Sequence, residues 1–361
     1  MNSFPNERAA GGVVQSTYRP PWWLPGGHLQ TIYARFLNCS SDLRLRRERW
    51  ETPDNDFIDL DWLDARADSA NLVVLFHGLE GCSSSHYARS LMDHARRLGW
   101  PGVVAHFRGC SGEHNRLARA YHSGDSSEID WILRRIKEKN PRLKIYAVGV
   151  SLGGNVLLKW LGEQGDRAFE VVEKAAAVSV PVDLAAAACV LDRGCRKLIY
   201  TRHFLKTLKQ KTLDKIVQHE LKIDLHQVRA ASTFRQIDHL FTAPVHGFES
   251  AEDYWSKASS KPWLPHIRVR TLLINARNDP FLPAVALPDA AEVSPAVGLE
   301  YPDCGGHVGF VSGRFPGDLD WLPRRIFNFF EGESSCSTFY GIKTSFTDEK
   351  LAPGLGPPEI T

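Results

Sequence analysis

Short apolar runs alternate with stretches of helical periodicity along the middle of the chain. Runs of five or six mostly apolar residues are typical of strands buried on both faces of a parallel sheet; they occupy 72–76, 103–107, 145–150, 175–180, 271–275 and 297–301. Apolar residues at spacings of three and four, typical of helices that pack on a sheet, recur at 84–98, 126–137, 154–161 and 319–330. This alternation predicts an α/β fold with a mostly parallel, doubly wound sheet.

Other segments depart from this alternation. Apolar and polar residues alternate singly at 43–50 and 57–63, on either side of a Pro-Asp-Asn turn, which predicts an antiparallel hairpin at the sheet edge. The strand pattern is absent from Val182 to Pro265, which predicts a helical insertion. We therefore expect four parts: a loosely ordered N-terminal extension, a core in two pieces, a helical lid and a loosely ordered tail, at 1–18, 19–181 with 266–332, 182–265 and 333–361.

Charge gives little indication of a macromolecular partner. The 44 Lys and Arg residues nearly balance the 42 Asp and Glu residues, and a net charge of +2 gives no reason to expect nucleic acid. There is no apolar run of ~18 residues and no signal-peptide pattern, so we expect a cytoplasmic protein. Residues 193–215 contain eight Lys or Arg and one acid, Asp214. They form either a solvated helix face or a contact with an anionic membrane or substrate. Nothing indicates an oligomeric state.

The strongest chemical motif follows the strand at 145–150. Gly149-Val150-Ser151-Leu152-Gly153-Gly154 matches G-x-S-x-G between a predicted strand and a predicted helix. A serine on such a sharp turn needs small neighbours, which Gly149 and Gly153 provide. The turn exposes the hydroxyl at the carboxyl end of the sheet, beside a helix N-terminus that favours negative charge. We therefore expect Ser151 to be a nucleophile.

A serine nucleophile needs a histidine base and a carboxylate that orients the histidine. In the α/β-hydrolase fold the order along the chain is nucleophile, acid, histidine. Asp279 follows the strand at 271–275, and His307 lies in a glycine-rich loop after the strand at 297–301. Asp303 is a second candidate acid, but it lies only four residues before His307. We expect Asp279, rather than Asp303, to orient His307.

Two loops after strands are candidate surroundings for the serine. His77-Gly78-Leu79-Glu80-Gly81 stands where this fold supplies amide donors to an oxyanion. The expected donors are the backbone N–H groups of Leu79 and Leu152. We expect His77 to order this loop rather than act as a base. Arg108, in a second loop, could pair with an acidic loop residue or with a substrate group, and we expect the structural role.

Metal and nucleotide binding have no sequence support. His106, Cys110 and His114 are spaced by four, but the glycines at 109 and 112 disfavour the helix that would align them as ligands. There is no C-x-x-C pair, no G-x-x-x-x-G-K-[ST] and no G-x-G-x-x-G after a strand. We therefore expect neither a metal nor another cofactor.

Several separated motifs together resemble one family. They are PPWWLPGGHLQTIYARF (20–36), HGLEG, HFRGCSG, GVSLGGN, ARNDPF and GGHVGF. These resemble the YheT-like α/β-hydrolases, a group with bacterial YheT, plant embryogenesis-associated proteins, and related eukaryotic lipases and alcohol acyltransferases. The resemblance covers about residues 18–332. It implies an esterase-like enzyme whose triad falls on Ser151, Asp279 and His307.

The sequence therefore predicts a serine carboxylic-ester hydrolase that acts on short- to medium-chain acyl esters or lipids through an acyl-enzyme. The same residues would serve an acyltransferase or a thioesterase, and an idle hydrolase scaffold used for binding is the alternative from another class. The predicted lid carries more apolar residues than an acetyl pocket needs, among them Val190, Leu191, Leu198, Ile199, Phe204 and Leu205. These either line an acyl pocket or pack the lid onto the core.

Overall fold

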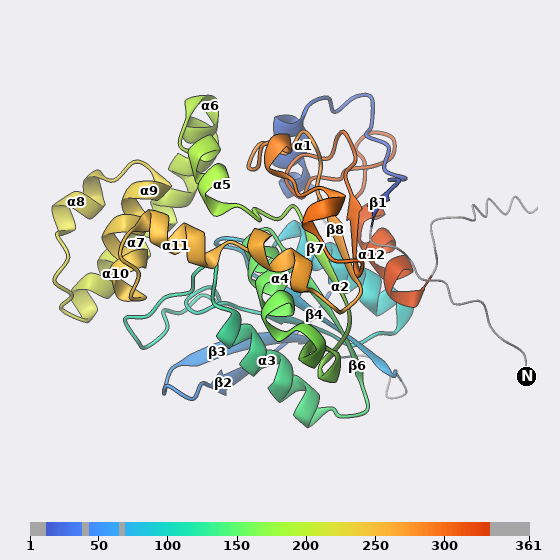
Figure 1. Cartoon of the computed structure of the whole chain (residues 1–361), viewed down its shortest axis with the longest axis horizontal. Helices are drawn as coiled ribbons and strands as arrows, with labels where there is room; N and C mark the ends of the chain where they lie inside the picture. Colours follow the sequence, from blue (N-terminus) through green and yellow to red (C-terminus); the bar gives the residue numbers. More distant parts are fainter. Residues whose placement is uncertain (1–11, 38–42, 65–68, 333–361) are drawn as a thin grey trace, which may run out of the picture.

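A computed structural model describes residues 12–37, 43–64 and 69–332. Its centre is a nine-stranded sheet in the order β1-β9-β8-β7-β6-β4-β5-β3-β2 (Figure 1). The strands are β1 Val13–Val14, β2 Arg46–Glu51, β3 Phe57–Leu63, β4 Asn71–Phe76, β5 Gly102–Ala105, β6 Lys144–Val150, β7 Val172–Val178, β8 Thr271–Ile274 and β9 Val297–Glu300. In this sheet order, neighbouring strands are parallel from β1 at one edge as far as β5, whereas β3 pairs antiparallel with both β5 and β2. The predicted α/β fold with an antiparallel edge hairpin is confirmed.

Helices cover both faces of the sheet, so its central strands are buried on both sides. Crossover helices α3 Ser126–Lys139 and α4 Leu152–Gln164 pack on one face, and α2 His86–Leu98 and α12 Trp321–Glu331 on the other (Figure 1). Along β4, Leu72, Val74 and Phe76 belong to the first core, and Val73 and Leu75 to the second. Successive side chains of a strand point to opposite faces. This arrangement explains why the strand is a continuous apolar run.

A helical segment separates β7 from β8. It contains α5 Leu184–Leu191, α6 Gly194–Arg196, η3 Lys197–Thr201, α7 Arg202–Gln218, α8 Leu225–Ala230, α9 Phe234–Ile237, η4 Asp238–Thr242, α10 Ala243–Val245, α11 Ala251–Ala258 and η5 Lys261–His266. Most of these helices gather to one side of the sheet (Figure 1). Leu205, Ile216, Val228, Ile237 and Phe241 form a small core of their own within it. We call residues 182–265 the lid.

Short elements complete the order: α1 Gly27–Tyr33, η1 Ala34–Phe36, η2 Gly165–Glu170, η6 Ala284–Ala286 and η7 Ala290–Glu292. No helix within the described ranges is long and apolar enough to cross a membrane.

The N-terminal segment differs from the expectation of a loose extension up to residue 18. Val13 and Val14 pair with β9, and Tyr18 is buried, with its hydroxyl donating to the carbonyl oxygen of Val311 at 2.7 Å. Residues 1–11 and the expected loose tail at 333–361 lie outside the described residues. Long-range contacts with β9 and Val311 order residues 12–18, because the segment has no strong local pattern of its own.

Candidate active site

Ser151 occupies the sharp turn between β6 and α4. Its φ of 53° lies in the left-handed region, which non-glycine residues rarely adopt. A Cβ added to Gly149 would lie 2.6 Å from the carbonyl oxygen of Gly153, and one added to Gly153 would collide with the carbonyl oxygen of Phe76. Glycine at both positions therefore lets the strand, the turn and the helix approach closely enough to present the serine.

The structure brings Ser151, His307 and Asp279 together from three separate loops. The Nε2 atom of His307 lies 2.9 Å from the Ser151 hydroxyl oxygen. Its Nδ1 atom lies 2.9 Å and 3.2 Å from the two carboxylate oxygens of Asp279. Both the histidine and the aspartate are buried. A carboxylate on Nδ1 keeps the proton there, so Nε2 is free to accept the serine proton.

Asp303, the other candidate acid, lies elsewhere. Its side chain is 93% exposed and its carboxylate is 3.6 Å from the guanidinium of Arg277. The four-residue spacing to His307 leaves the carboxylate on the outer side of the loop. The structure thus places Asp279, not Asp303, against the imidazole.

The histidine loop is held by α1, an element to which sequence reasoning assigned no role. The backbone N–H groups of Gly305 and His307 donate to the side chains of Gln30 and Thr31, both at 2.8 Å. Asn278 bonds to Gln30 and accepts from the N–H of Gly306 at 2.9 Å. The GGHLQT motif contained these residues, but no local pattern indicates which loop they contact.

An aromatic ring supports the imidazole from one side. Phe281 stacks on His307 with ring centroids 3.9 Å apart and planes inclined by 13°. Its backbone N–H donates to Asp279 at 2.7 Å. Tyr200 from the lid packs on Phe281 at 4.7 Å. The lid therefore contacts the acid loop through two aromatic side chains, which sequence reasoning also missed.

The loop that contains Leu79 passes beside the serine, and Leu152 directly follows the serine in the chain. A Cβ on Gly78 of this loop would lie 3.1 Å from the Cβ of Ser151. The N–H of Gly78 donates to Tyr87, and that of Glu80 to Tyr121. Leu152 is the first residue of α4, where amides have no partner within the helix. In the described part of the chain, neither the Leu79 amide nor the Leu152 amide donates to a backbone acceptor.

His77 and Arg108 both have structural partners. The Nδ1 of His77 donates to the carbonyl oxygen of Gly78 at 2.7 Å, and its Nε2 accepts from the N–H of Phe107 at 3.1 Å. Complete burial lowers the pKa of His77 to about 3, so the ring is neutral. Arg108 is buried and bonds to the carboxylates of Glu128, Asp54 and Asp56. His77 thus orders the loop after β4, as expected, and Arg108 pairs with acids, as expected.

The residues considered for metal binding have other partners or lie apart. The Nε2 of His106 lies 2.9 Å from the carboxylate of Asp61, while His114 is half exposed and faces Asp214 at 3.5 Å. Among the residues that the structure describes, no group of three or more His, Cys, Asp or Glu side chains could hold a metal ion.

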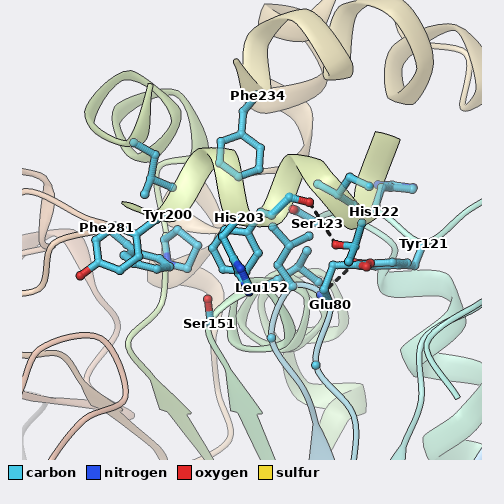
Figure 2. A pocket seen from close by; sticks show the side chains of 18 of the residues that line it. Glu80, Tyr121, His122, Ser123, Ser151, Leu152, Tyr200, His203, Phe234 and Phe281 are labelled. Atoms are coloured by element: carbon cyan, nitrogen blue, oxygen red, sulfur yellow. Dashed lines mark hydrogen bonds between the residues drawn. The ribbon is translucent and has the colours of Figure 1, made fainter. Parts of the chain in front are cut away.

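A cavity of about 940 Å³ lies between the lid and the core, and Ser151 and His307 are part of its wall. Figure 2 looks into it, with Ser151 on one side and Phe234 of the lid on the other. Of the six lid residues singled out from the sequence, Leu191, Ile199 and Phe204 line this cavity. Leu198 is exposed, and Leu205 packs inside the lid. Three of the six therefore line the pocket, whereas Leu205 and Leu198 take neither of the two roles that the sequence left open.

Comparisons with known proteins agree with this architecture. The sequence profile of the alpha/beta hydrolase fold family matches residues 71–313. The chain is 38% identical to YheT of Escherichia coli over 83% of this chain and 88% of that protein. It is 29% identical to human phospholipase ABHD3, over 86% and 78% of the two chains.

A monoacylglycerol lipase of Saccharomyces cerevisiae is 28% identical over 74% of this chain and 60% of that protein. A solved esterase of Pyrococcus furiosus superposes with a TM-score of 0.51 at 16% identity, covering 80% of this chain and 92% of that one, which shows the shared fold. The fold, the profile match and these relatives together establish that the chain is a hydrolase belonging to the esterase- and lipase-type alpha/beta hydrolase family, on the same branch as YheT.

Proposed function

We propose that this protein is a serine carboxylic-ester hydrolase that cleaves short- to medium-chain acyl esters through an acyl-enzyme. One observation carries the proposal: the hydrogen-bonded chain from Ser151 through His307 to Asp279 in the wall of a large, mostly apolar cavity. A hydroxyl 2.9 Å from an imidazole whose other nitrogen faces a buried carboxylate is the arrangement that activates a serine.

In the acylation half-reaction, the Ser151 oxygen attacks the carbonyl carbon of the ester and its proton passes to Nε2 of His307. The carbonyl oxygen becomes an oxyanion that accepts hydrogen bonds from the amides of Leu79 and Leu152. Donors already in position stabilise this charge without reorganising, and removing one typically costs ~10²–10³ in rate. The C–O bond then breaks, and the leaving alcohol takes the proton from His307.

In the deacylation half-reaction, water attacks the acyl-enzyme with His307 again as the base. The carboxylic acid leaves, and the proton returns to Ser151. Asp279 stays ionised throughout and stabilises the imidazolium that forms in each half-reaction. An alcohol in place of water would give acyl transfer, and a thioester would form the same acyl-enzyme.

The cavity supports acyl chains longer than acetyl. Leu191, Ile199 and Phe204 contribute apolar side chains to its lid wall, together with Leu208 and Phe234. Its volume is near the upper end of the ~300–1,000 Å³ found for small-molecule sites. Each methylene buried there adds ~0.8 kcal/mol, roughly fourfold in binding, until the space is full.

A fluorophosphonate probe tests the nucleophile. We expect labelling at Ser151, complete loss of labelling in Ser151→Ala, and unchanged labelling in Ser123→Ala, a serine that lines the same cavity. A panel of acetyl to octanoyl esters and thioesters then tests the substrate class. Labelling that persists in Ser151→Ala would refute the nucleophile. A kcat/KM that falls steadily from acetyl to octanoyl would refute the medium-chain part alone.

A further inference from the structure

Exposed apolar side chains lie on two segments that also line the cavity. Phe36 of η1 and Ile199 of η3 line the cavity and are also 74% and 41% exposed. Leu29 of α1 and Leu198 of η3 are 53% and 69% exposed without lining it. We call these four residues the mouth rim. Large apolar side chains that stay exposed beside a cavity are typical of a surface with a partner.

Direct contacts join the two segments that carry the mouth rim. The Nδ1 atom of His28 lies 2.9 Å from the hydroxyl of Tyr200, and the two rings stack with planes 7° apart. The guanidinium of Arg35 lies 3.5 Å from Nε2 of His203. Each contact pairs a residue of α1 or η1 with one of η3 or α7, so the mouth rim is one surface built from two distant parts of the chain.

The two segments that carry the mouth rim, 19–37 and 193–213, contain basic residues and no acidic ones. The first segment contains two arginines and the second contains seven Lys or Arg. Among these cations, Arg35, Arg193, Arg202 and Lys206 are exposed and form no ion pair with any described residue. Elsewhere in the described chain, many exposed arginines pair with acids, as Arg46 does with Asp64. Unpaired cations beside exposed apolar side chains are the chemistry of contact with an anionic lipid surface.

The position of the cavity favours a lipid surface over a protein partner. Phe36 and Ile199 belong both to the mouth rim and to the wall of the cavity, and the same cavity reaches Ser151. A protein seated on the rim would close the route to the serine. A lipid surface on the same rim would instead place ester lipids directly at the opening.

We propose that the mouth rim and its four unpaired cations dock on the surface of an anionic bilayer, so that the cavity opens into that surface. The second clause rests on the proposed ester hydrolase function. The docking itself does not, and it is measured independently of catalysis.

Cosedimentation with vesicles tests the docking. The intact protein should sediment with vesicles of phosphatidylcholine and phosphatidylglycerol, less with phosphatidylcholine alone, and less at high salt, because salt screens exposed charges. The double variant Leu29→Ser/Leu198→Ser should bind at least ~10-fold more weakly, since it removes two inserted apolar side chains. Neither residue lines the cavity, so its activity on a soluble short-chain ester should stay unchanged and report correct folding.

A matched control is Leu98→Ser/Phe169→Ser, which also replaces two exposed apolar side chains. Leu98 ends the crossover helix α2, and Phe169 follows the crossover helix α4. Each precedes a parallel strand, so both lie at the amino end of the sheet, away from Ser151. This control should bind vesicles like the intact protein. Absence of vesicle binding, or equal losses in the two double variants, would overturn the docking. If the intact protein showed no activity on the soluble ester, the proposed function would be overturned instead of the docking.

Discussion

Replacing Asp279 with asparagine tests which candidate acid orients His307, because the change exchanges one carboxylate oxygen for an NH₂ group. The side chain keeps its shape, and the bond from the N–H of Phe281 to Oδ1 at 2.7 Å holds an amide oxygen at that position. The amide NH₂ group then stands where Oδ2 now lies, 2.9 Å from Nδ1 of His307. Two donors cannot face each other, so the imidazole must carry its proton on Nε2.

That change of tautomer disables the base. With the proton on Nε2, His307 can no longer accept the proton of Ser151 across their 2.9 Å contact. The corresponding change in a serine protease triad lowers kcat by ~10⁴, equivalent to ~5 kcal/mol of barrier. We expect a loss of this size in kcat for Asp279→Asn on a soluble p-nitrophenyl ester.

Asp303→Asn is the matched control. This carboxylate is 93% exposed and forms only a 3.6 Å surface pair with Arg277. Such pairs contribute ~0–1 kcal/mol, so we expect less than a fivefold change in kcat. Far-ultraviolet circular dichroism of both variants checks that each is folded. Equal losses in the two variants, or a larger loss in Asp303→Asn, would refute the assignment of the acid.

Thr31→Val should lower kcat about tenfold, because it leaves the buried N–H of His307 without its acceptor. Thr17→Val is the control and should leave kcat unchanged, because the acceptor that it removes lies far along the chain from the triad. Steady-state kinetics compares the two variants. Stability should fall on acidification from pH 7.5 to 5.5, measured by urea unfolding. Burial lowers the pKa of four histidines to about 3 or 4; they are His77, His86, His122 and His246. Below pH 6.5 these histidines therefore bind protons in the unfolded chain but not in the folded protein. Burial raises the pKa of Glu128 and Asp238 to about 7 and 6, so these two groups bind protons in the folded protein and oppose the loss. The unfolded chain then takes up about two protons more than the folded protein, and each lowers the free energy of unfolding by up to ~1.4 kcal/mol per pH unit. A more stable protein at pH 5.5 would contradict this balance.

The sequence by itself predicted those features that depend on neighbouring residues. The apolar runs predicted every parallel core strand from β4 to β9, because a strand buried on both faces must be apolar at each position. Gly149, Ser151 and Gly153 predicted the turn after β6, because its backbone conformation requires small residues at fixed positions. Loops that follow parallel strands meet at one edge of the sheet, so the order of Ser151, Asp279 and His307 also indicated that these residues could meet.

Only the tertiary structure decided which side chains make contact across long distances in the chain. Asp279 and Asp303 both follow strands, and the direction of each side chain, which no local pattern encodes, places only Asp279 on His307. The support of the histidine loop by Gln30 and Thr31 spans more than 270 residues. The division of the lid's apolar residues among cavity, lid core and mouth rim has the same origin. Helical periodicity marks apolar positions, but packing determines whether the lid, the core, the substrate or the solvent covers them.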